Sequence, residues 1–145
     1  MAVIEVYTDG GCSPNPGNGG WAVVLVKNGE LVGEFYGGER ETSNNRMELT
    51  AAIKGLGAIA TDESIQLFTD SNYVKQGITT WIKGWKANGW KTAGRQPVKN
   101  QDLWQELDSV AATKKVEWSW LKGHAGNVWN ERVDGLVHKA RASLG

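Results

Sequence analysis

Cysteine and long apolar segments are scarce in this sequence of 145 residues, and each scarcity excludes a class of protein. The single cysteine, Cys12, excludes both a disulfide scaffold and a cysteine-rich zinc site. No apolar run approaches the length of a membrane span, and the first residues, Met1 to Glu5, do not resemble a signal peptide. We therefore expect a cytoplasmic protein that does not interact with membranes.

Length and composition favour one globular domain spanning residues 1–145. Hydrophobic residues make up 40% of the chain and charged residues 22%, which is typical of a folded protein rather than a disordered one. A chain of this size buries roughly 70% of the surface that it exposes when unfolded. One hydrophobic core is therefore sufficient to stabilise it.

The formal net charge of +0 conceals an uneven distribution of charge along the chain. The segment from Ser71 to Gln101 contains six basic residues and no acidic one, so the remainder of the chain is acidic. Three of the eight tryptophans, Trp81, Trp85 and Trp90, lie in this basic segment. Interleaved basic and aromatic residues favour nucleic-acid binding. The alternative is an exposed helix whose tryptophans pack on one another.

The hydrophobic periodicity predicts a mixed α/β fold. Five strands are expected at 3–8, 21–26, 31–36, 64–69 and 116–121, with helices at 44–60, 71–77, 79–88, 101–111 and 130–142 and loops at 9–20 and 123–128. The first three strands form an antiparallel meander, and right-handed crossovers make the other two parallel. The result is a mixed five-stranded sheet with helices on both faces.

Two of these strands end in similar tripeptides, Thr8-Asp9-Gly10 and Thr69-Asp70-Ser71. If the first and fourth strands are parallel neighbours, Asp9 and Asp70 face one another at the carboxyl edge of the sheet, where α/β proteins bind ligands. Two such carboxylates would raise each other's pKa unless a cation neutralised them. Alternatively, both aspartates simply cap turns.

Two further acids are candidate partners of this pair. Glu48 lies on the helix after the meander, although its spacing from Asn45 also fits a capping box. Asp134 lies on the last helix, one turn after Asn130, although it could also be a solvated helix acid. Four carboxylates without cysteine suit Mg²⁺ better than Zn²⁺.

Six motifs carry a resemblance to a known family: Thr8–Gly10, Asn15–Gly17, Asn44–Leu49, Thr69–Ser71, Lys122–Gly126 and Asn130–Asp134. In their order and spacing they resemble type 1 ribonuclease H, in particular the bacterial ribonuclease HI with a basic protrusion. The resemblance covers nearly the whole chain and implies a ribonuclease H-like fold. Residues 79–100, here called the handle segment, correspond to that protrusion.

The resemblance implies an endoribonuclease that hydrolyses the RNA strand of RNA–DNA hybrids and leaves 5′-phosphate and 3′-hydroxyl ends. Asp9, Glu48, Asp70 and Asp134 would be the catalytic and metal-binding carboxylates, with two Mg²⁺ ions as cofactor and Mn²⁺ as a substitute. His124 would assist proton movement or product release, unless it is an exposed histidine of no consequence. No obligatory protein partner is implied, so we expect a monomer.

The same resemblance implies a set of substrate contacts. Amide side chains near the site would sense the 2′-hydroxyl, while lysines bind phosphates and tryptophans pack on deoxyriboses. Several of these residues could instead form turns or helix caps. The set is Asn15, Ser43, Asn44, Asn45, Gln76, Trp81, Trp85, Lys86, Lys99 and Asn130.

Three positions depart from the family pattern. Glu41 stands where some members carry an arginine near a DNA phosphate, a loss for which Arg40 could compensate. Asn72 replaces a common glutamine, and Gly135 follows Asp134, where an acid is common. Two other functions stay open at this point: another nuclease of the same fold, or a catalytically silent hybrid-binding module.

Overall fold

The computed structural model describes residues 3–60, 62–92, 94–121 and 127–144. Its strands are β1 (Val3–Cys12), β2 (Gly17–Lys27), β3 (Glu30–Thr42), β4 (Ser64–Thr69) and β5 (Lys115–Trp120). Its helices are α1 (Asn44–Gly57), α2 (Asn72–Gln76), the π-helical turn η1 (Gly77–Trp81), α3 (Ile82–Ala87), α4 (Gln101–Ala112) and α5 (Val128–Ala142).

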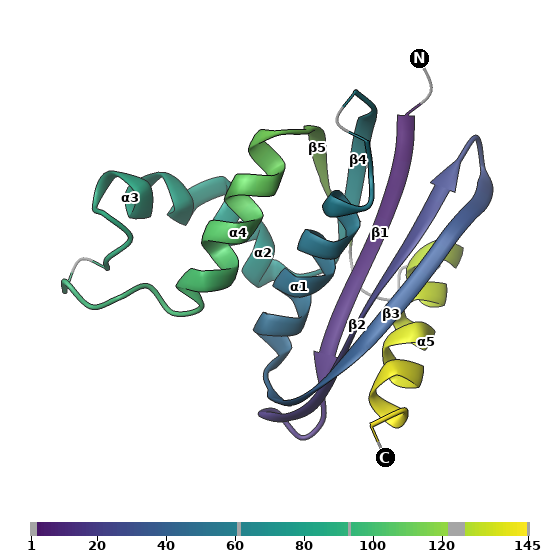
Figure 1. Cartoon of the computed structure of the whole chain (residues 1–145), viewed down its shortest axis with the longest axis horizontal. Helices are drawn as coiled ribbons and strands as arrows, with labels where there is room; N and C mark the ends of the chain where they lie inside the picture. Colours follow the sequence, from purple (N-terminus) through teal and green to yellow (C-terminus); the bar gives the residue numbers. More distant parts are fainter. Residues whose placement is uncertain (1–2, 61, 93, 122–126, 145) are drawn as a thin grey trace.

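The strands form one mixed sheet in the order β3-β2-β1-β4-β5 (Figure 1). β1, β2 and β3 pair antiparallel, whereas β4 pairs parallel with both β1 and β5. This architecture confirms the mixed five-stranded sheet predicted from the sequence. The parallel arrangement places the carboxyl ends of β1, β4 and β5 at one edge of the sheet.

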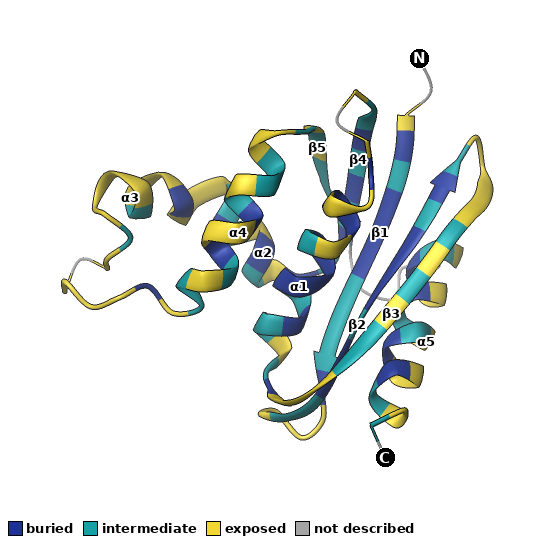
Figure 2. Cartoon of the chain, in the orientation of Figure 1, coloured by how far each residue is buried: buried dark blue, intermediate teal, exposed yellow. Residues whose placement is uncertain are grey.

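Helices cover both faces of the sheet, as predicted. α1 packs on β1 and β2, and α4 lies beside α1, whereas α5 packs on β2, β1 and β3 from the opposite face (Figure 1). Successive side chains of β1 point to opposite faces of the sheet. Val6 therefore belongs to the core beneath α1, and Tyr7 belongs to the core beneath α5. The buried residues accordingly lie along the central strands and the inner sides of the helices (Figure 2).

The first three strands are longer than predicted. The glycine-rich segment 9–20 is not a loop throughout, because its first four residues continue β1 and its last four begin β2. Close packing explains the glycines. A Cβ on Gly20 would lie 2.7 Å from the Val137 carbonyl oxygen of α5, and a Cβ on Gly19 would lie 2.5 Å from a Thr42 methyl. Glycine therefore allows β2 to approach its neighbours.

Two helix boundaries differ from the prediction, and the second has a local cause. α1 ends at Gly57 rather than near residue 60. α5 begins at Val128 rather than Asn130, because the Asn127 side chain caps it by accepting hydrogen bonds from the Trp129 and Asn130 amides. Gly135 does not interrupt α5, which continues to Ala142.

Gly77 does not end a helix, contrary to the sequence-based prediction. Its backbone is right-handed helical, and α2 continues through the π-helical turn η1 into α3. A Cβ at Gly77 would lie 1.9 Å from the Trp104 ring atom Cη2. The glycine therefore makes room for the buried Trp104 ring of α4 rather than for a turn.

The handle segment projects from the body of the protein on the side of α4 (Figure 1). Its return to α4 is fixed by a bridge between Lys91 and Pro97 and by the Val98 amide, which donates to the Trp90 carbonyl. Most of its residues are exposed (Figure 2). No helix in the described ranges is both long and apolar enough to cross a membrane.

Candidate active site

Parallel pairing of β1 with β4 brings Asp9 and Asp70 together. Tyr7 pairs with Phe68, and their rings stack with centroids 4.5 Å apart. Asp9 lies two residues beyond Tyr7 on β1, and Asp70 follows directly after β4. The similar ends of the two strands therefore meet at the same edge of the sheet, as the sequence predicted.

Glu48 reaches the same place because α1 lies directly against β1 at Gly10. A Cβ on Gly10 would lie 2.3 Å from the Met47 carbonyl carbon and 2.6 Å from the Glu48 amide nitrogen, both backbone atoms of α1. Only glycine permits this approach without a shift of the helix. The sequence alone did not reveal this packing role of Gly10.

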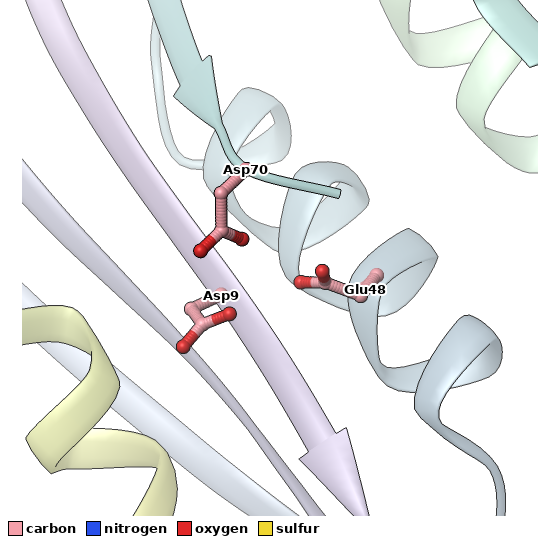
Figure 3. Close-up of side chains that lie close together, drawn as sticks. All are labelled: Asp9, Glu48 and Asp70. Carbon is pink, nitrogen blue, oxygen red and sulfur yellow. The ribbon is translucent and has the colours of Figure 1, made fainter. Parts of the chain in front are cut away.

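The capping-box alternative for Glu48 is wrong. α1 begins at Asn44, and its N-cap is Ser43, whose hydroxyl accepts a hydrogen bond from the Arg46 amide at 3.3 Å. Asn45 therefore lies within the first turn of the helix and caps nothing. The Glu48 side chain points instead toward the two aspartates (Figure 3).

Asp9, Glu48 and Asp70 form a compact carboxylate cluster. Each offers one oxygen atom, and these three atoms all lie within 4.8 Å of one another (Figure 3). Asp134 on α5 interacts with Asp9 from the other face of the sheet and hydrogen-bonds its side chain. Its own Oδ2 lies 3.7 Å from His138 Nε2, one turn along α5. The four predicted carboxylates thus converge on Asp9.

Burial and mutual repulsion raise the pKa values of this cluster. Burial is the larger cause of the rise in the pKa of Asp9 to about 8, and the charges of Asp70 and Asp134 add to it. The pKa of Glu48 is raised well above its usual value, first by burial and then by the charges of Asp9 and Asp70. The Gly10 amide hydrogen-bonds both groups and opposes the rise. Without a cation, burial and repulsion therefore both favour protonation of the Asp9 and Glu48 carboxylates.

The donor set fits a hard divalent cation. Glu48 Oε1 is buried and has no hydrogen-bond partner among the described residues. Such an orphaned acceptor is costly unless a positive charge or donor completes it. Because the ligand atoms of the cluster are all carboxylate oxygens, they match the preference of Mg²⁺ and Mn²⁺. Asp9, Glu48 and Asp70 are the residues that could hold the ion.

The raised pKa of Asp9 predicts an unusual pH dependence of stability in the absence of metal. Between the ordinary value of 3.8 and about 8 the folded state holds a proton that the unfolded state has lost, so the free energy of unfolding falls as pH rises across this range. In chelator, urea unfolding at pH 5 and pH 8 should show this decrease. Asp9→Asn should flatten it, whereas the exposed control Asp62→Asn should not. A wild-type stability that increases with pH in chelator would contradict the prediction.

Three of the predicted substrate residues, Asn15, Ser43 and Asn44, lie where the loop before β2 meets the N-terminal end of α1. The Asn15 Oδ1 accepts from the Asn44 amide at 3.2 Å, and the Asn44 Oδ1 accepts from the Cys12 amide at 2.7 Å. With Ser43 as the helix cap, these polar side chains tie the loop to α1. These residues therefore do stabilise the loop and cap the helix. Asn15 and Asn44 are also exposed, so both could still contact a substrate.

The remaining predicted residues lie in different surroundings. Asn45 and Gln76 are half-buried, on α1 and at the end of α2, and Asn130 is buried on α5. Lys99 is exposed just before α4. His124 lies outside the described residues.

The tryptophans of the handle segment pack on one another, as one alternative proposed. Trp85 lies 5.8 Å from Trp81, 6.3 Å from Trp90 and 5.4 Å from the buried Trp104, measured between ring centroids. We call these four rings the aromatic stack. Trp81 still exposes 37% of its surface, so packing and a substrate contact are compatible there.

A polar network that the sequence did not reveal joins α1 to α4. Both terminal nitrogens of Arg46 donate to Asp102, at 3.0 and 2.8 Å, and one also donates to Asn100 Oδ1 at 3.2 Å. The Tyr73 hydroxyl accepts from Asn100 Nδ2 and from Trp104 Nε1. The hydrogen-bonded partners are separated by up to 56 positions, and no periodic pattern relates them.

The structure does not place Arg40 where it could replace the arginine that some family members carry at the position of Glu41. The Arg40 guanidinium donates to the Leu144 carbonyl at 2.6 Å, near the end of the chain. Glu41 lines a pocket with Pro16 and Gly17. The acid therefore faces that pocket without a neutralising hydrogen bond from Arg40.

Fold and site together define a class: an α/β protein whose parallel strands carry, at their carboxyl ends, a carboxylate cluster that could hold a divalent cation. Comparisons with known proteins agree. The RNase H family model matches residues 1–142. Ribonuclease H of Halorhodospira halophila is 56% identical over 137 residues, which cover 94% of this chain and 91% of that protein. Ribonuclease H of Neisseria gonorrhoeae is 53% identical, with 97% of each chain covered.

Solved structures give the same result. LC9-RNase H1, described as a type 1 RNase H with the type 2 active-site motif, is 30% identical and superposes with a TM-score of 0.85 over 100% of this chain and 74% of its own. LC11-RNase H1, crystallised in complex with an RNA/DNA hybrid, superposes at 0.75 with 20% identity, over 97% of this chain and 98% of its own, which supports the fold. The chain belongs to the ribonuclease H family and is a nuclease.

Proposed function

We propose that this protein hydrolyses the RNA strand of RNA–DNA hybrids by a two-metal-ion mechanism and leaves 5′-phosphate and 3′-hydroxyl ends. The observation that carries the proposal is the carboxylate cluster, with its orphaned Glu48 oxygen and raised pKa values, in a chain of the ribonuclease H family. We also infer that the chain is one domain that acts as a monomer in the cytoplasm.

The proposed roles of the four carboxylates follow from the central position of Asp9. Asp9 interacts with Asp70, Glu48 and Asp134 and is the residue best placed to bridge two cations. Two bound Mg²⁺ ions would supply the positive charge needed to activate a water and to stabilise the leaving 3′-oxygen. Asp70 and Glu48 would hold the cation on the side of the cluster beneath α1, and Asp134 would orient the water on the side of α5. His124 would move a proton on product release.

Recognition of the hybrid is assigned to the surfaces on either side of the cluster. The proposed 2′-hydroxyl contacts are the amides of Asn15, Asn44, Asn45 and Gln76, with Ser43 and Asn130 beside them. The DNA strand would lie against the handle segment, where Trp81 and Trp85 offer ring surface and Lys86 and Lys99 offer charge.

The test is a cleavage assay on end-labelled duplexes. We expect cleavage of the RNA strand in an RNA–DNA hybrid with Mg²⁺ or Mn²⁺, no cleavage of RNA duplex or single strands, and no cleavage in chelator. Analysis of the new termini should give 5′-phosphate and 3′-hydroxyl. Preference for another duplex would favour a different nuclease of this fold, and binding without cleavage would favour a silent hybrid-binding module.

Lys86→Gln should raise the KM for the hybrid about threefold to tenfold at low salt with little change in kcat, because it removes one phosphate contact. The ratio of mutant to wild-type KM should shrink as salt increases. Lys86 Nζ also lies 3.3 Å from Asp108 Oδ2 of α4, so a purely structural role must be separated.

Asp108→Asn is the matched control, since it breaks the same ion pair and leaves the lysine in place. We expect this variant to keep or lower the wild-type KM. An equal rise in KM for both variants would show that Lys86 acts through Asp108 and not on the substrate.

A further inference from the structure

A pocket of about 230 Å³ opens beside the carboxylate cluster, between the start of α2 and the end of β5. Asp70 belongs both to its wall and to the cluster. The pocket is smaller than the roughly 300–1,000 Å³ of typical small-molecule sites, so it suits one unit of a polymer rather than an independent ligand. None of the substrate contacts proposed above lines it.

The floor of the pocket is firmly built. Thr69 pairs with Trp120 across the two parallel strands, and the Leu121 amide extends this pairing by donating to the Thr69 carbonyl at 2.9 Å. The Thr69 hydroxyl accepts from the Ser71 amide, and the Ser71 hydroxyl accepts from the Val74 amide, each at 3.1 Å. Backbone groups therefore hold both hydroxyls in place, and a ligand would meet a preformed surface.

The rim of the pocket carries a cation. Lys75 lines it from α2, is exposed, and takes part in no ion pair among the described residues. Trp120 also lines the pocket, and its ring stacks on Trp118 with centroids 5.9 Å apart and an interplanar angle of 13°. An ammonium group and an aromatic residue that line the same pocket are a combination that can bind the phosphate and the sugar or base of a nucleotide.

The positive charge of Lys75 can offset the repulsion between the carboxylate cluster and a bound polyanion. A cluster of carboxylates repels the phosphates of an approaching polyanion, and metal ions inside the cluster act mainly on the phosphate being cleaved. The next phosphate along the strand needs its own counter-charge. Lys75 is the basic residue that lines the pocket shared with Asp70.

We propose that this pocket binds the RNA nucleotide next to the cleaved linkage, with Lys75 contacting its phosphate and Trp120 packing on its sugar or base. The proposal rests on the proposed function, because it assigns a subsite for the strand on which the cluster acts. Lys75 is thus a substrate-binding residue distinct from the lysines of the handle segment.

The test compares Lys75→Gln with wild type on a hybrid whose principal cleavage linkage has been mapped in Mg²⁺. We expect the KM to rise about tenfold at low salt with kcat little changed, and the slope of log KM against log salt to fall by about 1. Lys75→Arg should restore most of the affinity. Lys115→Gln, at the opposite end of β5, is the control and should behave as wild type.

A nick scan then locates the contact. The RNA strand is assembled from two pieces whose junction lacks its phosphate, and the junction is moved one linkage at a time. At one position next to the cleaved linkage, the nick should bring the KM values of wild type and Lys75→Gln together, while at other positions the difference persists.

Two results would overturn the assignment of Lys75 alone: an unchanged KM for Lys75→Gln in a protein that cleaves the hybrid, or a raised KM that no nick position suppresses. A wild-type protein that leaves the hybrid uncut would overturn the proposed function, and this subsite with it. Thermal unfolding of each variant checks that the fold is intact.

Discussion

Asp9→Asn and Asp70→Asn are each expected to lower kcat for hybrid cleavage by about a thousandfold or more. Both substitutions keep the shape of the side chain and remove a charged oxygen from a cluster whose ligand atoms lie within 4.8 Å of one another. Loss of one ligand costs several kcal/mol of cation binding and transition-state stabilisation, and about 1.4 kcal/mol corresponds to tenfold in rate. Initial rates in Mg²⁺ measure the effect.

Binding separates this catalytic loss from a folding defect. The Asn variants should bind the hybrid in chelator at least as tightly as wild type, because neither substitution adds a negative charge facing the phosphates. Asp62→Asn, which alters an exposed acid away from the site, should keep full activity. Normal turnover by Asp70→Asn would disprove the metal-site assignment.

Gly10→Ala is expected to lower kcat by about a hundredfold, although it changes no charged group. The new methyl would meet the backbone of α1 at 2.3 Å, so the helix must move outward and carry Glu48 away from Asp9. Displacements of about 1 Å at a catalytic centre can cost this much. The same clash should reduce the free energy of unfolding by about 1–3 kcal/mol, as overpacking does.

Gly135→Ala provides the matched control, because a Cβ at Gly135 meets no atom within 4 Å and its helix is otherwise regular. This variant should gain about 0.5–1 kcal/mol in stability and keep its activity. Urea unfolding and initial cleavage rates of both variants decide the matter. Wild-type kcat in Gly10→Ala would show that α1 does not need its close contact with β1.

The sheet and the pairing of Asp9 with Asp70 were predictable from the sequence because both depend on local patterns. Alternating apolar residues identified the strands, and the crossover rule predicted that the fourth strand runs parallel to the first. If these strands were neighbours, their shared ending placed both aspartates together, and the pairing of β1 with β4 meets that condition. Here short-range pattern and topology suffice.

The placement of Glu48 was harder to predict, because it depends on a contact between distant segments. Spacing alone allowed Asn45 and Glu48 to form a capping box, and only the Ser43 cap and the close contact at Gly10 exclude it. The prediction that a helix ends at Gly77 was wrong for the same reason. In the sequence, a glycine that makes room for the Trp104 ring looks the same as a glycine that ends a helix. The link from Arg46 to Asp102 spans 56 positions and has no local signature at all.

The aromatic stack gives the protein a built-in optical reporter. Indole rings 5.4–6.3 Å apart exchange excitation energy and couple their electronic transitions, and the buried Trp104 joins those of the handle segment to the core. A shift of the handle segment by a fraction of a ring width would therefore change the exciton signal in circular dichroism. Docking of a duplex could be followed on the unlabelled protein in real time, without cleavage.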